Sequence, residues 1–281
     1  APIGLLIPPS GILIIYALVS GGTSVSALFM AGYLPGILWG LAVMITAYFI
    51  AKKNNYSVAP KMSFNEKLKV FLEAIPSLLL IVVVIGGITA GIFTGAAVAV
   101  AYCFILSFFF YKSISLKDMP NILLESGKMT AVIMLLIGAS SVMSWIMAYT
   151  NIPNLITNLL LGISSSKILI FIIMNIILLI IGTFMDLTPA VLIFTPILLP
   201  IAKNFGMDPI HFGIMLITNL AIGNITPPVG SALFIGCKVG KTRIEEVIKY
   251  IMPFYIAIIV VLGLVTFVPN ISLMIPKLLG L

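Results

Sequence analysis

A lone carboxylate inside a long apolar stretch is the residue whose chemistry most needs an explanation. Asp186 is the only acidic residue between Lys128 and Asp208, and it follows Gly182 and Thr183 in a polar interruption of an apolar run. A carboxylate at bilayer depth is costly unless a cation or a polar partner accompanies it. The nearby threonine hydroxyls and main-chain carbonyls are hard oxygen donors, which suit a small cation. The pattern therefore predicts a Na⁺ site around Asp186.

The same residue also fits the N-cap of a helix. Leu187, Thr188 and Pro189 follow it directly, and proline is favoured in the first turn of a helix. Aspartate is a preferred N-cap residue, because its carboxylate accepts a hydrogen bond from a free N–H group of that turn. A cap and a place beside a cation are compatible, so both interpretations stay open.

A second chemical feature is a Pro-Pro pair that occurs twice. The segment 3–10, which contains Pro8 and Pro9, reappears 219 residues later as 222–229, with a similar Ile-Gly start. Farther on, Pro35 corresponds to Pro253 at nearly the same offset. Two matches at one offset indicate an internal repeat. Adjacent prolines remove backbone donors and clash with the preceding turn, so each copy of the motif predicts a broken helix. In the second copy we expect free main-chain carbonyls near residues 223–227.

Ser10 follows the first Pro-Pro pair and precedes a new apolar segment. The N-terminus of a helix presents free N–H groups and the positive end of its dipole, which favour an anion. We therefore expect Ser10 to contact an anionic substrate. A plain N-cap is the alternative.

Composition defines the setting of these features. Of the 281 residues, 61% are hydrophobic and 8% are charged, whereas soluble domains are about 25% charged. This excludes an ordinary soluble enzyme, a disordered chain and a nucleic-acid binder. The charge-free runs are each long enough for at least one membrane helix of about 20 residues; they are 1–51, 74–111, 129–166, 209–237 and 250–276.

Most lysines and arginines lie in the connections 52–73, 112–128 and 238–249. The positive-inside rule places these connections in the cytoplasm. The stretch from Lys167 to Lys203 must then return to the side it came from, and two helices of about 15 residues meeting near Asp186 fit this requirement. We therefore expect a re-entrant hairpin at 167–203, a broken helix at 210–240, a C-terminus outside, and spans at about 28–51, 74–92, 95–111, 129–149 and 250–269.

With this orientation the first broken helix runs outward and the second inward. Inverted repeats with broken helices at the midplane are typical of secondary transporters. Two proline kinks with only a packing role are the alternative. The fold class predicted from the residues is an all-α integral membrane protein. It is an inverted-repeat secondary transporter with a re-entrant helical hairpin and broken helices.

Several motifs resemble the large membrane subunit of TRAP (tripartite ATP-independent periplasmic) transporters. They are Ile7-Pro8-Pro9-Ser10, the stretch 28–36, Gly87 to Thr94, Gly182 to Pro200, Gly206 to Gly213, and Asn219 to Gly230. The resemblance covers essentially the whole chain. In the family the first hairpin precedes the first broken helix, and the printed sequence begins at Ala1, so we expect an N-terminal part before it.

The resemblance implies an elevator-type importer of organic acids in the bacterial inner membrane, driven by Na⁺. It implies two partners, a small four-helix membrane subunit, separate or fused, and a periplasmic binding protein that delivers the substrate. The Na⁺ residues that it implies are Thr183, Asp186, Gly223, Thr226 and Pro227, with Gly4 and Pro8 at a further Na⁺ site; the substrate residues are Ile7, Pro9 and Ser10.

The same resemblance divides the chain into a transport domain and a scaffold. The first-repeat transport domain ends in 1–27, and the second-repeat transport domain is 167–240. The scaffold comprises a helix with a cytoplasmic amphipathic connection at 28–73, linking helices at 74–166 and a C-terminal helix at 241–281. Sialic acid is the single substrate we expect. The alternatives are a stand-alone Na⁺/dicarboxylate carrier that needs no binding protein, and a channel or membrane scaffold.

Overall fold

The computed structural model describes residues 2–56, 63–89, 95–152, 155–156, 158, 162, 166–227 and 230–281. Within these residues the secondary structure is helical throughout, which confirms the all-α prediction. The first elements are the 3₁₀ turn η1 (Pro2–Leu5), α1 (Gly11–Val19), α2 (Val25–Lys53), α3 (Phe64–Thr89), α4 (Gly95–Ile105), the π-helical turn η2 (Leu106–Phe110) and α5 (Met119–Tyr149). The later ones are α7 (Lys167–Phe184), α8 (Leu187–Asn204), α9 (Pro209–Gly223), α10 (Ser231–Gly240), α11 (Ile244–Phe267) and α12 (Pro269–Leu278).

Five helices in the described part are long and apolar enough to cross a membrane: α2, α5, α7, α8 and α11. An apolar segment crosses a membrane as a helix because a helix satisfies its backbone polar groups with its own hydrogen bonds. The ends of the expected span 74–92 and of the motif 87–94 lie outside the described residues, as do Pro228 and Val229 of the second repeat copy.

Several helix boundaries differ from the predicted spans. α5 begins at Met119 and not near 129, and α11 begins at Ile244 and not near 250. Charged residues end a membrane span, but they do not end a helix: in α5, Lys128 donates to Glu125 at 2.7 Å, one turn away. The expected surface segment before residue 74 is continuous with the following helix as α3, and α12 was not predicted.

The chain divides into two compact units. One unit comprises 51–134, and the other comprises 1–50 together with 135–281. In the smaller unit α3 packs against α4, and the Tyr102 hydroxyl donates to the Pro76 carbonyl at 2.6 Å. All residues predicted to bind substrate or ions belong to the larger unit.

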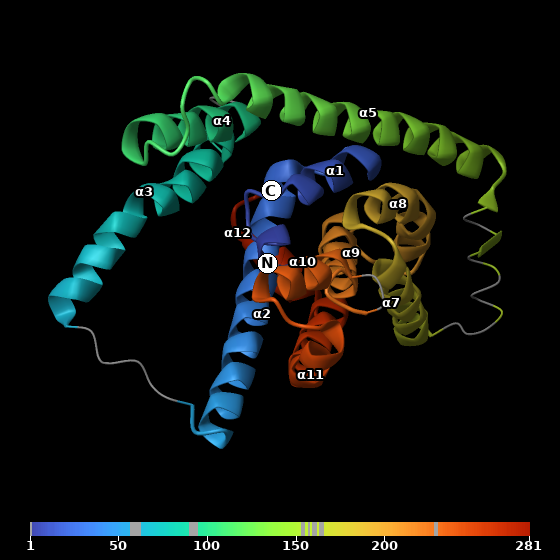
Figure 1. Ribbon diagram of the computed structural model, residues 1–281. Helices are drawn as coiled ribbons and strands as arrows, with labels where there is room; N and C mark the ends of the chain where they lie inside the picture. Colours follow the sequence, from blue (N-terminus) through green and yellow to red (C-terminus); the bar gives the residue numbers. More distant parts are fainter. Residues whose placement is uncertain are drawn as a thin grey trace. The chain divides into compact units, whose positions relative to one another are not determined.

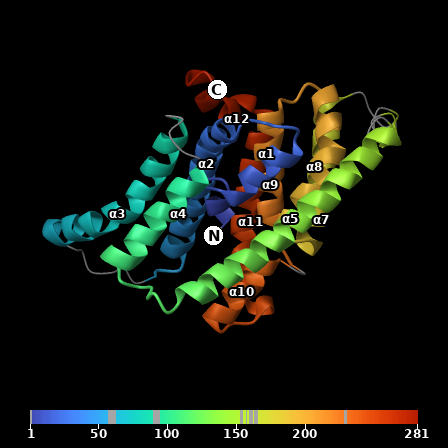
Figure 2. The ribbon, with the colours of Figure 1, turned by 90° about the horizontal axis from the view of Figure 1, so that it is seen from above.

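Helix α9 is the centre of the larger unit. Every residue from His211 to Gly223 is buried, and α9 packs against α1, α7, α8, α11, α12 and η1 (Figure 1, Figure 2). It begins sharply, because the Asp208 side chain accepts from Ile210 N at 2.8 Å and Pro209 occupies the first turn. The Tyr16 hydroxyl of α1 donates to the Pro209 carbonyl at 2.6 Å.

The connection before α5 yields a pH prediction. Hydrogen bonds from the Ser115 hydroxyl and the Ser115 backbone N–H hold the pKa of Asp118 below its usual value. The charged carboxylate therefore favours the folded connection at neutral pH, and this contribution is lost as the pH falls through the lowered pKa. We expect Ser115→Ala to raise the pKa of Asp118 in an NMR titration of labelled aspartate carboxyls. An unchanged titration curve would contradict this.

Candidate functional site

The hairpin predicted at 167–203 corresponds to α7 and α8, which pack against each other and are joined at Met185–Asp186. Each helix has 18 residues, slightly longer than the 15 or so expected. At the tip the Thr183 hydroxyl donates to the Ile180 carbonyl at 2.6 Å. That bond uses the hydroxyl proton and leaves lone pairs of the oxygen available to a cation.

Asp186 stands at the N-cap position of α8, as one of the two interpretations expected. Its main-chain carbonyl accepts from Ala190 N at 3.2 Å. Its side chain is exposed and makes no capping hydrogen bond. In the part of the chain that the structure describes, no basic side chain forms an ion pair with Asp186. The carboxylate is therefore free to meet a cation.

The tip is held directly against the second broken helix by two glycines. A Cβ built on Gly223 would lie 2.5 Å from the carbonyl carbon and the Cα of Gly182. Only a residue without a side chain allows α7 and α9 to approach this closely. Thr183 directly follows Gly182, and the break directly follows Gly223, so this contact lies next to the predicted ion-binding residues of both elements.

The second broken helix comprises α9, a turn at 224–227 and α10. The Thr226 hydroxyl donates to the Ile222 carbonyl at 2.7 Å, and Thr226 N donates to the Gly223 carbonyl at 2.9 Å. The Asn224 carbonyl accepts from Ala232 N at 3.1 Å, and the Ile225 carbonyl accepts from the Tyr255 hydroxyl. The sequence predicted free carbonyls at 223–227, but those of Gly223, Asn224, Ile225 and Thr226 each accept a hydrogen bond. A carbonyl oxygen has two lone pairs, so one such bond does not by itself prevent it from binding a cation.

The first broken helix has the predicted form, with η1, an irregular segment at 6–10 and α1. Gly4 lies in η1, and the peptide bond between Pro8 and Pro9 is cis. The segment packs against α2, where a Cβ on Gly32 would lie 2.1 Å from the Leu6 carbonyl oxygen and one on Gly36 would lie 2.5 Å from the Ile7 side chain. Both glycines therefore allow α2 to pack closely against the irregular segment at 6–10.

Ser10 is buried, with 3% of its surface exposed, and its hydroxyl donates back to the Leu5 carbonyl at 2.6 Å. It occupies the N-cap position of α1 without a side-chain capping bond, so it is not a plain N-cap. The hydroxyl bridges the break. The N–H groups at the start of α1 have no intrahelical acceptor, and α1 packs against α8, the helix that follows Asp186.

A buried polar network behind the tip was missed by sequence reasoning. Asn219 Nδ2 donates to the main-chain and side-chain oxygens of Asn175 at 2.9 and 2.8 Å. Asn175 Nδ2 in turn donates to the Phe171 carbonyl at 2.8 Å and to Thr266 Oγ1 at 3.2 Å. The network joins α7, α9 and α11 one to three turns from the glycine contact. The sequence does contain an indication of this network, since asparagines inside apolar helices need hydrogen-bond partners.

We expect Asn175→Ala to lower the free energy of unfolding by about 1–2 kcal/mol, because the substitution removes the side-chain acceptor of Asn219 and the bonds to Phe171 and Thr266. Thermal unfolding of the purified protein in detergent measures the effect. Asn54→Ala, at an exposed position, is the control. Equal stability of the two variants would contradict the prediction.

Two comparisons place the chain among known proteins. Residues 1–271 match the family described as "Tripartite ATP-independent periplasmic transporter, DctM component". The chain is 48% identical over 281 residues to the uncharacterised protein YgiK of Salmonella typhimurium, covering 99% of this chain and 64% of that protein. It is 39% identical to the sialic acid TRAP transporter large permease protein SiaM of Vibrio cholerae, covering 98% of this chain and 65% of that protein. It is also 39% identical to the C4-dicarboxylate TRAP transporter large permease protein DctM of Rhodobacter capsulatus, with coverages of 99% and 67%. The chain thus spans about two-thirds of the length of these relatives.

Proposed function

Because the chain belongs to the DctM family of tripartite ATP-independent periplasmic transporters, we propose that it serves in Na⁺-coupled import of organic acids across the bacterial inner membrane. The family is one of transport proteins and not of enzymes. Relatives named for sialic acid and for C4-dicarboxylates are equally similar to this chain, so the shared chemistry is a carboxylate. Sialic acid is the substrate we propose to test first.

The observation that carries the proposal is the contact between Gly182 and Gly223. Gly182 directly precedes Thr183 at the hairpin tip, and Gly223 lies three residues before Thr226. Both hydroxyls donate to carbonyls of their own helices, which leaves their oxygens as ligands for a hard cation. We propose that these oxygens, with main-chain carbonyls from Gly223 to Pro227, bind Na⁺. Asp186 compensates the charge of the ion in the low-dielectric surroundings.

The first broken helix supplies the complementary chemistry. We propose that the free N–H groups at the start of α1, together with the positive end of its dipole, bind the substrate carboxylate beside Ile7 and Pro9. In this proposal the hydroxyl oxygen of Ser10 also contacts the substrate, while its proton bonds to the Leu5 carbonyl and fixes the irregular segment at 6–10. Gly4 and Pro8 border a further Na⁺ site in this proposal. The two repeats are inverted, and transport follows an elevator mechanism.

The proposed assembly includes the small four-helix membrane subunit and a periplasmic binding protein. Large apolar side chains of α5 are exposed along much of its length, Met129, Leu135 and Trp145 among them. Such a surface requires lipid or a membrane partner. With the basic connections in the cytoplasm, the C-terminus lies in the periplasm.

The experiment that tests the proposal is substrate uptake by the full-length protein with its small subunit in proteoliposomes. An inward Na⁺ gradient is imposed with and without the cognate binding protein. We expect uptake to require both. Uptake with Na⁺ but without the binding protein would instead favour the stand-alone dicarboxylate carrier. Uptake independent of Na⁺ would contradict the proposed coupling.

A further inference from the structure

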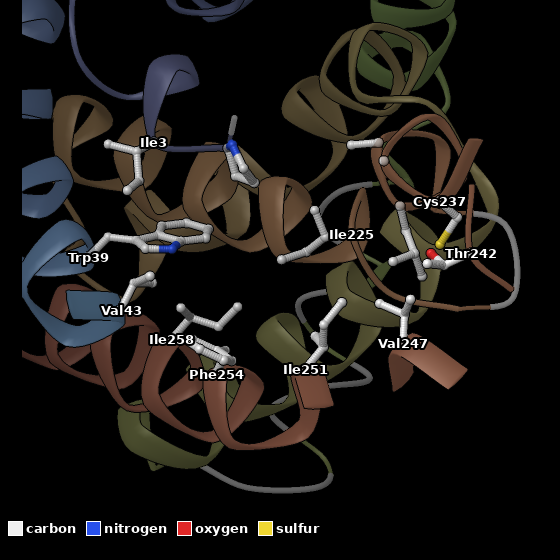
Figure 3. Close-up of a pocket in the computed structure, with 14 residues that line it drawn as sticks. Ile3, Trp39, Val43, Ile225, Cys237, Thr242, Val247, Ile251, Phe254 and Ile258 are labelled. Carbon is white, nitrogen blue, oxygen red and sulfur yellow. The ribbon is translucent and has the colours of Figure 1, made fainter. Parts of the chain in front are cut away.

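The larger unit contains an apolar pocket of about 490 Å³, within the range of about 300–1,000 Å³ that ligand sites occupy. Figure 3 shows Trp39 and Ile3 at one end and Cys237 and Thr242 at the other. The walls come from η1, α2, Ile225 of the second break, α10 and α11. Apart from Thr242, the lining side chains are apolar or absent, so the pocket suits a hydrocarbon chain.

A polar hollow continues from the same end. Cys237 and Thr242 line both spaces, and the second is also lined by Lys238, Arg243, Glu245 and Glu246. Two cations and two carboxylates therefore surround the mouth of an apolar pocket. The α10 side chains beside it include Phe234 and Ile235, which are exposed. This surface is apolar up to the charged connection, as expected for a helix that ends at the membrane interface.

We propose that this composite site binds one phosphatidylethanolamine molecule. An acyl chain fills the apolar pocket up to Trp39. The phosphodiester accepts charge-assisted hydrogen bonds from Lys238 and Arg243, and the primary ammonium donates to Glu245 and Glu246. A site with cations alone would match any anionic lipid. The two carboxylates repel a second negative charge and favour a headgroup that carries N–H donors.

The charge pattern sets the expected order of lipids. Phosphatidylglycerol offers the phosphate and hydroxyl donors but no cation, so the two glutamates form no ion pair with it. Phosphatidylcholine offers a cation without N–H groups, so it forms no hydrogen bond to them. Phosphatidylethanolamine alone satisfies all four charged side chains. We therefore expect it to bind at least threefold more tightly than either of the other two.

Trp39 provides a native reporter, because it is 2% exposed and lines the pocket. The full-length protein with its small subunit is titrated in detergent with lipids that carry identical brominated acyl chains and one of the three headgroups. Bromine quenches tryptophan fluorescence on close approach. The quenching of Trp39 is obtained by subtracting the fluorescence of the Trp39→Phe variant from that of the unmodified protein at each lipid concentration. The contribution of the other tryptophans is thereby removed.

Two glycines give a matched pair of variants for the pocket. A Cβ on Gly236 or on Gly263 meets no atom within 4 Å, and both residues lie in helices, but only Gly236 lines the pocket. We expect Gly236→Leu to fill the pocket and reduce Trp39 quenching by phosphatidylethanolamine at least threefold. Gly263→Leu changes the helix backbone in the same way and leaves quenching unchanged. Thermal unfolding of both variants verifies that they are folded.

The headgroup contacts are tested by Arg243→Gln and by the double variant Glu245→Gln, Glu246→Gln. We expect the first to weaken all three lipids and the second to remove the preference for phosphatidylethanolamine. Lys249→Gln, in the same connection but outside the hollow, is the control. Equal quenching by the three headgroups, a preference for phosphatidylglycerol, absence of Trp39 quenching, or equal behaviour of the two glycine variants would each overturn the proposal. These results do not depend on whether the protein transports an organic acid.

Discussion

Gly223→Ala is expected to reduce Na⁺-driven uptake at least tenfold. The added methyl group would lie 2.5 Å from Gly182 Cα and 2.8 Å from the Gly182 carbonyl oxygen, where only a backbone shift provides room. Forcing atoms into a packed site typically costs about 1–3 kcal/mol. Because the shift separates the hairpin tip from the break, it displaces the two threonine oxygens that we propose as Na⁺ ligands.

Two further alanine variants make this test specific. A Cβ on Gly182 would lie 3.2 Å from Gly223 Cα, so Gly182→Ala should be milder than Gly223→Ala. Gly263→Ala meets no neighbour within 4 Å and gains up to about 1 kcal/mol of helix propensity. Uptake is measured in proteoliposomes at several Na⁺ concentrations. Equal activity of all three variants would show that the close approach of α7 and α9 is dispensable.

Gly32→Ala is expected to have an effect of similar size on the first broken helix. Its Cβ would lie 2.1 Å from the Leu6 carbonyl oxygen and 3.1 Å from the Leu6 carbonyl carbon. Leu6 is fully buried, so the break at 6–10 must move away from α2. We expect a loss of about 1–3 kcal/mol in the free energy of unfolding and at least a tenfold rise in KM for the substrate.

The same helix supplies the control for this variant. A Cβ on Gly40 lies 3.9 Å from the Ile3 Cδ1 atom, an ordinary contact, so Gly40→Ala should retain wild-type stability and uptake. If Gly32→Ala destabilises the protein but leaves KM unchanged, the first break is only a packing element and the proposed substrate site is wrong.

The sequence predicted the helical class and the positions of the breaks because both follow from local chemistry. Long uncharged runs require helices in a membrane, and Pro-Pro pairs interrupt them. The structure has a helix boundary at Asp186, and α9 and α10 are separate helices at 209–223 and 231–240, in agreement with the expected interruptions. Helix ends in charged segments were misplaced, as at the starts of α5 and α11, because charge limits membrane depth and not helix length.

Tertiary contacts determine what the sequence left open. Hydropathy does not specify which face of a helix meets which neighbour, so neither the Gly182–Gly223 contact nor the Asn175–Asn219 network was predicted. The two interpretations of Asp186 had the same local pattern. In the structure Asp186 occupies the N-cap position without a side-chain bond to the turn that it precedes, and the Na⁺ site stays a prediction.

The Na⁺ dependence of uptake in Asp186→Ala tests the proposed ion site most directly. Uptake by the full-length protein with its small subunit and binding protein is measured in proteoliposomes over a range of Na⁺ concentrations, with Asp118→Ala as the control carboxylate in the smaller unit. We expect Asp186→Ala to need at least tenfold more Na⁺ for half-maximal uptake, or to lose coupled uptake, while Asp118→Ala behaves as wild type. Normal uptake by Asp186→Ala with an unchanged Na⁺ dependence would show that Asp186 does not contribute to the ion site.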